Sequence, residues 1–589
     1  MKTSLLAMAV FSWALSASAL ATPESATNGL RALFDEAWER ELRDDPVRAS
    51  DLGDHRYDAL WPDLSSAAIE QRHAADIATV ARLQRIDRAS LPPAEQLNYD
   101  LFAYQYQRRI RAHPFKPWLY ELRARDGVQT LSATAEALSF ATVTDYENWI
   151  ARLRGLDRYI AQYTDQLRIA IRERRVQPKS TMEQVETTLK ALIAGDDATQ
   201  SPFYGPFTRI PDSIAAAERT RLQASGKEAI EKVVTPAYRR FEKFFRTEYL
   251  AHSRSTVGIW DTPDGDAFYR ERVAFFTTTT LSPAEIHELG LKEVTGIRAQ
   301  IDQVMQRTGF NGTFAEFATF LRTDPQFYYH SADELYHAYV LTTKAIEPEL
   351  VKLFRTLPRT PVGVRVVPEN IAPNQATAYY MAPAADGSRA GYYYVNLYRP
   401  EIRPRYEVEV LTAHEAVPGH HLQIALGKEL HDLPAFRRDA RNVAFAEGWG
   451  LYAEGLGERL GLYADPYSKY GELSYDLWRA VRLVVDTGIH FEHWDRQQAV
   501  EYFKANSSKS DAEIETEVAR YIDWPGQALA YKIGQLRFLA LRDRAQHALG
   551  ARFDIREFHD VVLRNGPVPF DVLDSLVDSW LAGKTASAG

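Results

Sequence analysis

The 589-residue sequence contains no cysteine, and this absence excludes two kinds of chemistry. A thiol nucleophile and a thiolate metal site both require cysteine sulfur. Any metal ion must therefore be held by His, Asp or Glu side chains. A lipid anchor also needs a cysteine after an N-terminal signal, so we expect no lipoprotein-type attachment.

An excess of positive charge is missing as well. The formal net charge is −9 and the sequence pI is near 6.0, with Lys and Arg scattered along the chain. Because nucleic-acid binding relies on a basic footprint, we expect no nucleic-acid partner. Beyond the N-terminus no segment approaches the roughly 18 consecutive apolar residues of a membrane helix, so we expect no membrane span.

The N-terminus has the pattern of a secretory signal. Lys2 precedes the apolar run Leu5–Leu15, and Ala19-Leu20-Ala21 is an A-x-A cleavage pattern. We predict that residues 1–21 are a signal peptide cleaved after Ala21. The mature chain is then expected to be periplasmic or secreted.

Helical periodicity dominates residues 22–357. Apolar residues recur with a period near 3.6 in Ala67–Leu83, Tyr146–Arg174 and Asp212–Arg254, which are also rich in helix-forming residues. We interpret 22–357 as a helical scaffold lobe. Residues 358–589 are then a catalytic lobe that forms one continuous functional unit with it.

The pattern changes between residues 358 and 404. Val362–Val367 is rich in β-branched valine, and the runs Thr377–Met381 and Gly391–Leu397 flank a turn-rich segment. This predicts a strand and a β-hairpin. Such a hairpin could brace the helices, or its edge could pair with an extended peptide.

Helical patterns return after this segment. The expected helices are Phe436–Gly461, Lys469–Phe491, Ala499–Phe503, Asp511–Ile522 and Gly526–Leu549. The predicted fold is therefore mainly α, with two helical lobes around a deep cleft and a small β element near the catalytic segment.

The chemistry of the chain is concentrated in His414–His421, which nearly fits the zinc-peptidase motif H-E-x-x-H. In that motif one helix presents two histidines four residues apart, and the glutamate activates a metal-bound water. Here Pro418 occupies the position of the second histidine. The segment is either a metal site on a broken helix or a helix–turn–helix junction with surface histidines.

Helix geometry favours one of the two later histidines. An unbroken helix places His420 about 240° round from His414, and places His421 on the right face but about 10 Å further along. A Pro-Gly bulge that absorbs two residues carries His420 into the ligand position. We predict His414 and His420 as ligands and Glu415 as general base, with His421 as the alternative ligand.

A third ligand is expected in the segment Phe445–Glu454. Glu447 and Glu454 share a helix face with Gly450 between them, which suggests that another element approaches closely. We assign Glu447 as third ligand, and Glu454 as the carboxylate that orients a histidine ring. The alternative is an ordinary acidic helix face that continues to Glu458.

The helix expected at Lys469–Phe491 carries a polar stripe of Arg479, Arg482, Asp486 and His490. The rest of the helix is apolar almost all round, which indicates burial, and buried charges are paired or functional. We predict that Asp486 orients a ligand or His490 and that His490 stabilises the oxyanion. Arg479 or Arg482 would hold a substrate carboxylate. The alternative is a solvated charged face.

A tyrosine in the next helical segment is a further candidate. Tyr531 shares a face with Gln527 and Gly534, and glycine leaves space for a ligand. A tyrosine hydroxyl is a good donor to a developing oxyanion, so we predict this role for Tyr531. The alternative is a core tyrosine.

Taken together, the motifs resemble the bacterial domain-of-unknown-function family 885. They are HEAVPGHH, AEGWGLYAE, RLVVDTGIH and PGQALAYKIG, with the early segment Asp45–Asp54. The resemblance implies a largely helical zinc-peptidase-like protein of the gluzincin kind. By wider analogy it is similar to thimet oligopeptidase, carboxypeptidase Taq and angiotensin-converting enzyme. There glycine precedes the second histidine ligand, which favours His420.

The resulting prediction is a zinc-dependent hydrolase that holds one Zn²⁺ per chain and cleaves amide bonds in a peptide or peptide-like substrate. Two alternatives use the same residues. One is a metal-dependent amidase acting on a non-peptide or modified substrate. The other is a non-catalytic metal-binding protein.

Overall fold

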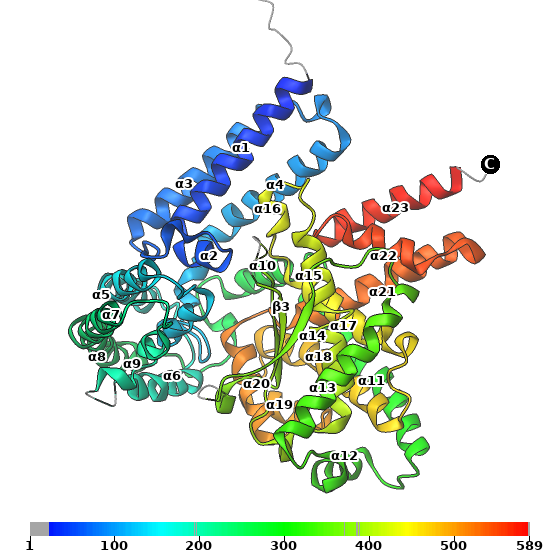
Figure 1. Cartoon of the computed structure of the whole chain (residues 1–589). Coiled ribbons are helices and arrows are strands. Elements are labelled where there is room, and N and C mark those ends of the chain that lie inside the picture. Colours follow the sequence, from blue (N-terminus) through cyan, green and yellow to red (C-terminus); the bar gives the residue numbers. More distant parts are fainter. Residues whose placement is uncertain are drawn as a thin grey trace, which may run out of the picture.

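The computed structural model describes residues 23–586, apart from 194, 196, 370, 371, 385, 386 and 388. The predicted signal peptide, residues 1–21, lies outside the described residues. Within them the chain is mainly helical with a small three-stranded sheet, which confirms the predicted fold class (Figure 1).

The first helices form an elongated layer on one side of the molecule (Figure 1). Local signals fix where they begin: the Asp45 side chain accepts from Arg48 N at the start of the second helix, and Pro46 follows at the first helical position. The helices are α1 (Pro23–Asp44), α2 (Pro46–Asp51), α3 (Ser66–Leu83) and α4 (Pro93–Ala112).

The next helices group together at the left of Figure 1 and have an apolar core of their own, built from residues between Trp61 and Tyr249. They are α5 (Val143–Arg172), α6 (Lys179–Leu192), α7 (Ala216–Ala229), α8 (Thr235–Phe244) and α9 (Leu250–His252). The stretch predicted at Asp212–Arg254 is helical from 216 to 252, with π-turns at Ile230–Val234 and Phe245–Tyr249.

The remaining helices make up the larger body of the molecule. Before the sheet they are α10 (Gly265–Thr277), α11 (Pro283–Thr308), α12 (Phe314–Thr323) and α13 (Ala332–Ile346). After the sheet they are α14 (Val408–Glu415), α15 (His420–Lys428), α16 (Ala435–Arg438), α17 (Val443–Leu456), α18 (Pro466–His490), α19 (Arg496–Ala505), α20 (Asp511–Asp523), α21 (Leu529–Leu549), α22 (Ile555–Leu563) and α23 (Phe570–Ala586).

One helix prediction in this body was wrong. Phe436–Gly461 was expected as a single helix, but the chain breaks between α16 and α17. The Asn442 side chain accepts a hydrogen bond from Phe445 N and so starts a new helix. Asparagine favours such a capping position over a helix interior, because its side chain competes with the helical hydrogen bonds.

The sheet lies directly before the helix that ends at Glu415. Its strands β1 (Val362–Val366), β2 (Ala378–Met381) and β3 (Gly391–Val395) have the order β1-β3-β2. The pairing of β2 with β3 is antiparallel, as the predicted hairpin requires, and Ala378 lies opposite Val395. The sequence did not predict that β1 pairs with β3 in parallel.

The apolar clusters do not divide at residues 357 and 358, where the sequence predicted the lobe boundary. One cluster joins residues of α1 and α4 to residues of α14, α17 and α21–α23. A second cluster joins α11 and α12 to α18 and α20. Helices on both sides of the predicted boundary therefore share the cores that support the segment 414–447.

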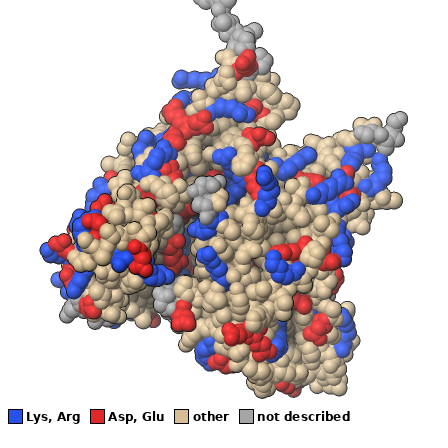
Figure 2. Space-filling view, viewed as in Figure 1, with Lys and Arg blue, Asp and Glu red and all other residues tan. Residues whose placement is uncertain are grey.

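Two features of the surface bear on partners. None of the helices in the described part of the chain is long and apolar enough to cross a membrane. On the face shown in Figure 2, basic and acidic side chains are interspersed rather than gathered by sign.

Candidate metal centre

The segment His414–His421 is a helix, a tight connection and a second helix. Helix α14 ends at Glu415 and α15 begins at His420, and the peptide bond between Val417 and Pro418 is cis. A side chain at Gly419 would collide with the carbonyl oxygen of His414, so this position accepts only glycine. The connection brings the first residue of α15 close to the last turn of α14.

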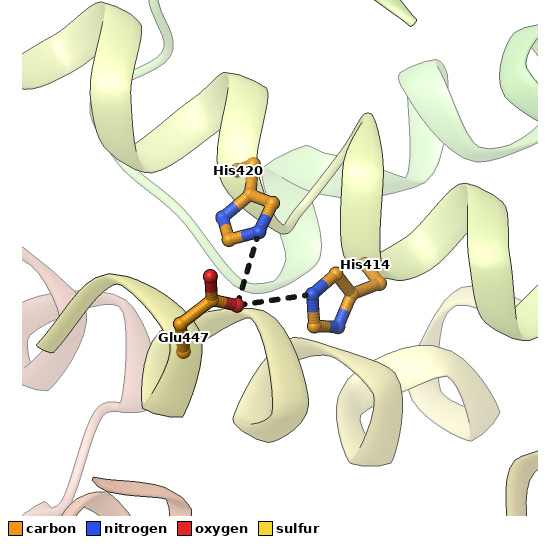
Figure 3. Close-up of side chains that lie close together, drawn as sticks. All are labelled: His414, His420 and Glu447. Carbon is orange, nitrogen blue, oxygen red and sulfur yellow. Dashed lines mark ion pairs between the residues drawn. The ribbon is translucent and has the colours of Figure 1, made fainter. Parts of the chain in front are cut away.

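His414, His420 and Glu447 lie together, with one ligand-type atom from each within 4.8 Å of the others (Figure 3). Glu447 Oε2 is 3.7 Å from His414 Nε2 and 3.5 Å from His420 Nε2. Ligands of a tetrahedral zinc ion at about 2.1 Å are about 3.4 Å apart. The spacing of these three side chains therefore fits a bound metal ion.

The far side of the His414 ring is fixed by a buried carboxylate. Glu454 Oε1 lies 2.7 Å from His414 Nδ1, and Arg479 Nη2 lies 3.3 Å from the same oxygen. The Glu454 carboxylate accepts from Nδ1–H, and Nε2 of the same ring faces Glu447. Gly450 makes room for the ring, because a Cβ there would lie 2.7 Å from His414 Cε1.

Three carboxylates surround these two imidazoles. Burial alone would lower the pKa of His414, but its hydrogen bonds with Glu447 and Glu454 raise that pKa to about 9. Burial opposes ionisation of Glu447, yet the two imidazoles hold its pKa well below the usual range. With Glu415 and Glu454, the centre attracts a cation.

Glu415 differs from the other two carboxylates. It is half-buried at the end of α14. Burial raises the pKa of Glu415, and this effect exceeds the opposing influence of His414 and His420. A carboxylate with a raised pKa is a better proton acceptor than an ordinary exposed glutamate.

His421, the alternative ligand, points away from this cluster. Its Nδ1 lies 3.0 Å from Tyr380 Oη and its Nε2 lies 3.1 Å from the carbonyl oxygen of Thr360. Burial lowers the pKa of His421 to about 4, so the ring is neutral. His421 therefore braces α15 against the sheet and the chain before it, and does not lie beside His414.

His490 is not placed for the predicted contact with an oxyanion. Its Nδ1 accepts from Ile259 N at 3.1 Å and its Nε2 donates to the carbonyl oxygen of Tyr521 at 2.9 Å. The side chain is fully buried, and burial lowers its pKa to about 3. Since both ring nitrogens are used inside the core, His490 has none left for a substrate.

Asp486 also lies in the core. It accepts hydrogen bonds from Tyr269 Oη at 2.7 Å and from Gly526 N at 3.1 Å. Burial raises its pKa to about 7. The predicted contact with a metal ligand or with His490 is replaced by bonds that join α18 to α10 and to the chain before α21.

The two arginines of the stripe are buried and paired, which differs from the predicted grip on a substrate carboxylate. Arg479 binds Glu454 and the carbonyl oxygen of Tyr475. Arg482 binds Glu517 at 3.1 Å and the hydroxyl of Tyr521. Buried guanidinium groups need such partners, so these side chains have little freedom to bind a ligand.

Tyr531 is half-buried and keeps a hydroxyl proton to donate. Arg520 Nη2 donates to its oxygen at 3.3 Å, and the Arg482 guanidinium lies 4.5 Å from its ring centre. One turn further on, Gly534 packs directly on Gly448, beside Glu447. The helix that carries Tyr531 thus packs against the helix that carries Glu447.

Sequence reasoning missed the residues that hold the site from outside. Trp449 Nε1 donates to the carbonyl oxygen of Pro418 at 2.9 Å and so fixes the connection between α14 and α15. Tyr380 pairs with His421, which braces α15. A tryptophan between Gly448 and Gly450 was the one local signal, since glycines on both sides indicate crowding.

Fold and site together define a mainly helical protein with a His–His–Glu cluster able to hold a metal ion. A family model for bacterial proteins of unknown function, DUF885, matches residues 46–577. The chain belongs to this family, and the resemblance drawn from its motifs is confirmed.

Solved structures show the same fold. A protein of Colwellia psychrerythraea described as a "putative lipoprotein" is 30% identical, with a TM-score of 0.90 over 95% of this chain and 100% of its own. A Shewanella oneidensis protein with a similar description is 18% identical, with a TM-score of 0.70 over the same shares. None of the curated proteins compared matches the chain.

Proposed function

We propose that this protein is a zinc-dependent hydrolase that cleaves amide bonds in peptides. The observation that carries the proposal is the cluster of His414, His420 and Glu447 with Glu415 beside it, because three protein ligands and an adjacent base are typical of hydrolytic zinc sites. These three residues would hold one Zn²⁺, which supplies Lewis acidity to water and to a scissile carbonyl.

The protein's own residues divide the remaining work. Glu415 takes a proton from the attacking water and passes it to the leaving amine. Glu454 holds the orientation of the His414 ring, and Arg479 pairs with the Glu454 carboxylate. Tyr531 is the proposed donor to the oxyanion, since its hydroxyl accepts from Arg520 and is free to donate.

The test is the substitution Glu415→Gln in the zinc-loaded protein. Hydrolysis of short peptides with free and blocked termini is measured with and without a chelator, and zinc content is measured in parallel. We expect turnover to fall by at least about a hundredfold with zinc content unchanged, because a general base contributes about 10²–10⁴ in rate.

The outcomes separate the proposal from its alternatives. Activity only on non-peptide amides would point to an amidase. Zinc binding with no hydrolysis in wild type would point to a non-catalytic metal-binding protein. Equal turnover in wild type and Glu415→Gln would remove Glu415 from the mechanism.

We also propose that the mature protein lies outside the cytoplasm. The Colwellia and Shewanella relatives are each described as a "putative lipoprotein". In this chain Lys2 precedes the apolar run Leu5–Leu15, and Ala19-Leu20-Ala21 follows it. Fractionation with N-terminal sequencing should find a mature chain beginning at Thr22 in the extracytoplasmic fraction.

A further inference from the structure

A cavity of about 180 Å³ lies between α2, α4, the chain from α16 to α17 and the chain before α23. Its charged lining is almost entirely basic, in a chain whose net charge is −9. One carboxylate and five guanidinium groups line it: Asp439, Arg48, Arg108, Arg109, Arg437 and Arg441.

Partners within the protein neutralise part of this charge. Arg48 and Arg109 both bind Glu41, at 3.0 and 2.9 Å. Asp439, the carboxylate of the lining, pairs with Lys428 at 3.7 Å. Three guanidinium groups, those of Arg108, Arg437 and Arg441, remain to be explained.

No carboxylate of the described residues lies within 4 Å of these three guanidinium groups. Arg437 is 3% exposed and donates to Asn98 Oδ1 at 2.8 Å and to the carbonyl oxygen of Asn565. Burial lowers the pKa of Arg437 to about 10, so the group is still charged at neutral pH. It adds positive potential to the cavity.

Arg108 lies where this cavity meets a second one of about 450 Å³, since both are lined by Arg108 and Tyr104. Its guanidinium stacks on Phe275 at 4.1 Å from the ring centre. Its buried Nε has no hydrogen-bond partner among the described residues. Its Nη1 donates to the carbonyl oxygen of Phe275 at 3.5 Å. Stacking orients the planar group, and its remaining N–H groups can meet a ligand.

Arg441 also lines the cavity, and its side chain is exposed. The nearby acidic group on α2 is Asp51, which lies more than 4 Å from Arg441. Burial raises the pKa of Asp51, and the charge of Arg441 opposes that rise. An exposed arginine and a stacked arginine that line the same cavity can together bind one anion.

We propose that this cavity binds the carboxylate of an organic acid through Arg108 and Arg441, with Arg437 contributing charge. Guanidinium forks match a carboxylate, and Leu101 and Phe436 supply an apolar wall. The volume is below the roughly 300–1,000 Å³ of drug-sized pockets, so a small acid or the acidic end of a longer ligand fits.

The cavity is separate from the metal centre, but one helix, α17, connects the two. Asn442 lines the cavity and caps α17, and Glu447 follows five residues later on the same helix. Five residues of helix span about 7.5 Å. The carboxylate could thus belong either to an acidic substrate or to a separate small acid.

Calorimetric titration of the full chain with glutarate tests the site without relying on catalysis. We expect binding of glutarate and none of glutaramide, its uncharged analogue. Arg108→Gln and Arg441→Gln should each weaken glutarate binding about tenfold or more, because hydrogen bonds between charged groups are strong. The exposed Arg43→Gln on α1 is the control and should bind like wild type.

Arg108→Gln could fail to fold, because Arg108 is partly buried. Arg441 is exposed, so Arg441→Gln keeps the fold and still tests the site. No heat with wild type, equal binding of glutaramide, or unchanged affinity in Arg441→Gln would overturn the proposal. Peptide assays then identify the source of the carboxylate. If acidic peptides have a lower KM than neutral peptides, and Arg441→Gln removes this difference, the carboxylate belongs to the substrate. If the two kinds of peptide have equal KM values while glutarate still binds, the carboxylate belongs to a separate acid.

Discussion

At the scale of single residues, the two adjacent histidines of the motif have separate environments. His420 faces Glu447, whereas His421 is held between Tyr380 and the carbonyl oxygen of Thr360. His421 is buried and hydrogen-bonded on both ring nitrogens, so its role is structural. The side chain of His420 is 13% exposed and remains accessible to a metal ion. The two positions can therefore be distinguished by matched substitutions.

We expect His420→Gln to abolish the stabilisation that zinc gives the protein, and His421→Gln to keep it. A ligand at a hundred times its Kd stabilises the folded state by about 2.7 kcal/mol, so zinc should raise the thermal midpoint of wild type and His421→Gln. Calorimetric melting with and without zinc measures this. A zinc shift lost only in His421→Gln would reverse the assignment.

Arg479 acts on the site through Glu454. Removing the guanidinium leaves the Glu454 carboxylate, which is 1% exposed, without its cationic partner, so Glu454 holds the His414 ring less firmly. We expect Arg479→Met to weaken zinc binding by about tenfold to a hundredfold, as other losses around metal ligands do. Competition with a chromophoric chelator measures the affinity.

Arg482→Met provides the matched control for this substitution. Arg482 lies on the same helix, is equally buried and also pairs with a glutamate, Glu517, but it does not bind Glu454. Both variants should lose stability, since breaking a buried pair costs about 3–5 kcal/mol. Equal loss of zinc affinity in both would show that Arg479 has no specific role.

At the scale of elements, periodicity predicted helices better than their interruptions. The ranges expected at 67–83 and 511–522 agree closely with α3 and α20, because a long apolar stripe determines the element. The break between α16 and α17 depends on one side chain, Asn442, and on the packing that leaves it free to cap. The apolar periodicity of a segment does not reveal a break that is caused by a single capping side chain.

The same limit applies to the site. The pattern of histidines and glutamates brought His414, His420 and Glu447 into one hypothesis, because ligand spacing is a local property of sequence. It assigned Asp486 to orienting a ligand or His490, and His490 to the oxyanion. In the structure their partners are Tyr269 and Ile259, from a segment more than 200 residues away. The sequence suggested a functional role for these buried polar groups. In the structure they form hydrogen bonds with other residues of the core.

His490 also gives a prediction about pH. Its folded-state pKa is about 3 against 6.5 in an unfolded chain, so the unfolded state binds more protons between these values. The contribution of neutral His490 to the free energy of unfolding is fully present above pH 6.5 and is lost as the pH falls toward 3. At pH 4.5 the loss is about 2 to 3 kcal/mol.

His490→Gln isolates this contribution, because glutamine can donate and accept hydrogen bonds but does not titrate. We expect the variant to be less stable than wild type at pH 7.5 and to lose less of its stability between pH 7.5 and 4.5. Urea unfolding at the two values measures both quantities. Parallel losses in the two proteins would show that His490 is already protonated in the fold.

At the scale of the whole molecule, the chain is joined by cores that cross its sequence. Phe34 of α1 lies 4.9 Å from Phe436, between ring centres, and Phe102 of α4 lies 5.1 Å from the same ring. The metal centre therefore rests on packing from both ends of the chain. By contrast, the group α5–α9 encloses its own apolar cluster.

This difference predicts how fragments behave. Residues 358–586 contain all the proposed metal ligands but lose the α1, α4 and α11 side of their cores, so we expect no cooperative unfolding and no tight zinc binding from this fragment alone. Residues 117–254 keep most of one cluster and should unfold cooperatively. Thermal melts followed by circular dichroism compare the two. A sharp transition in 358–586, with zinc bound as in the full chain, would contradict this expectation and show that residues 358–586 fold independently.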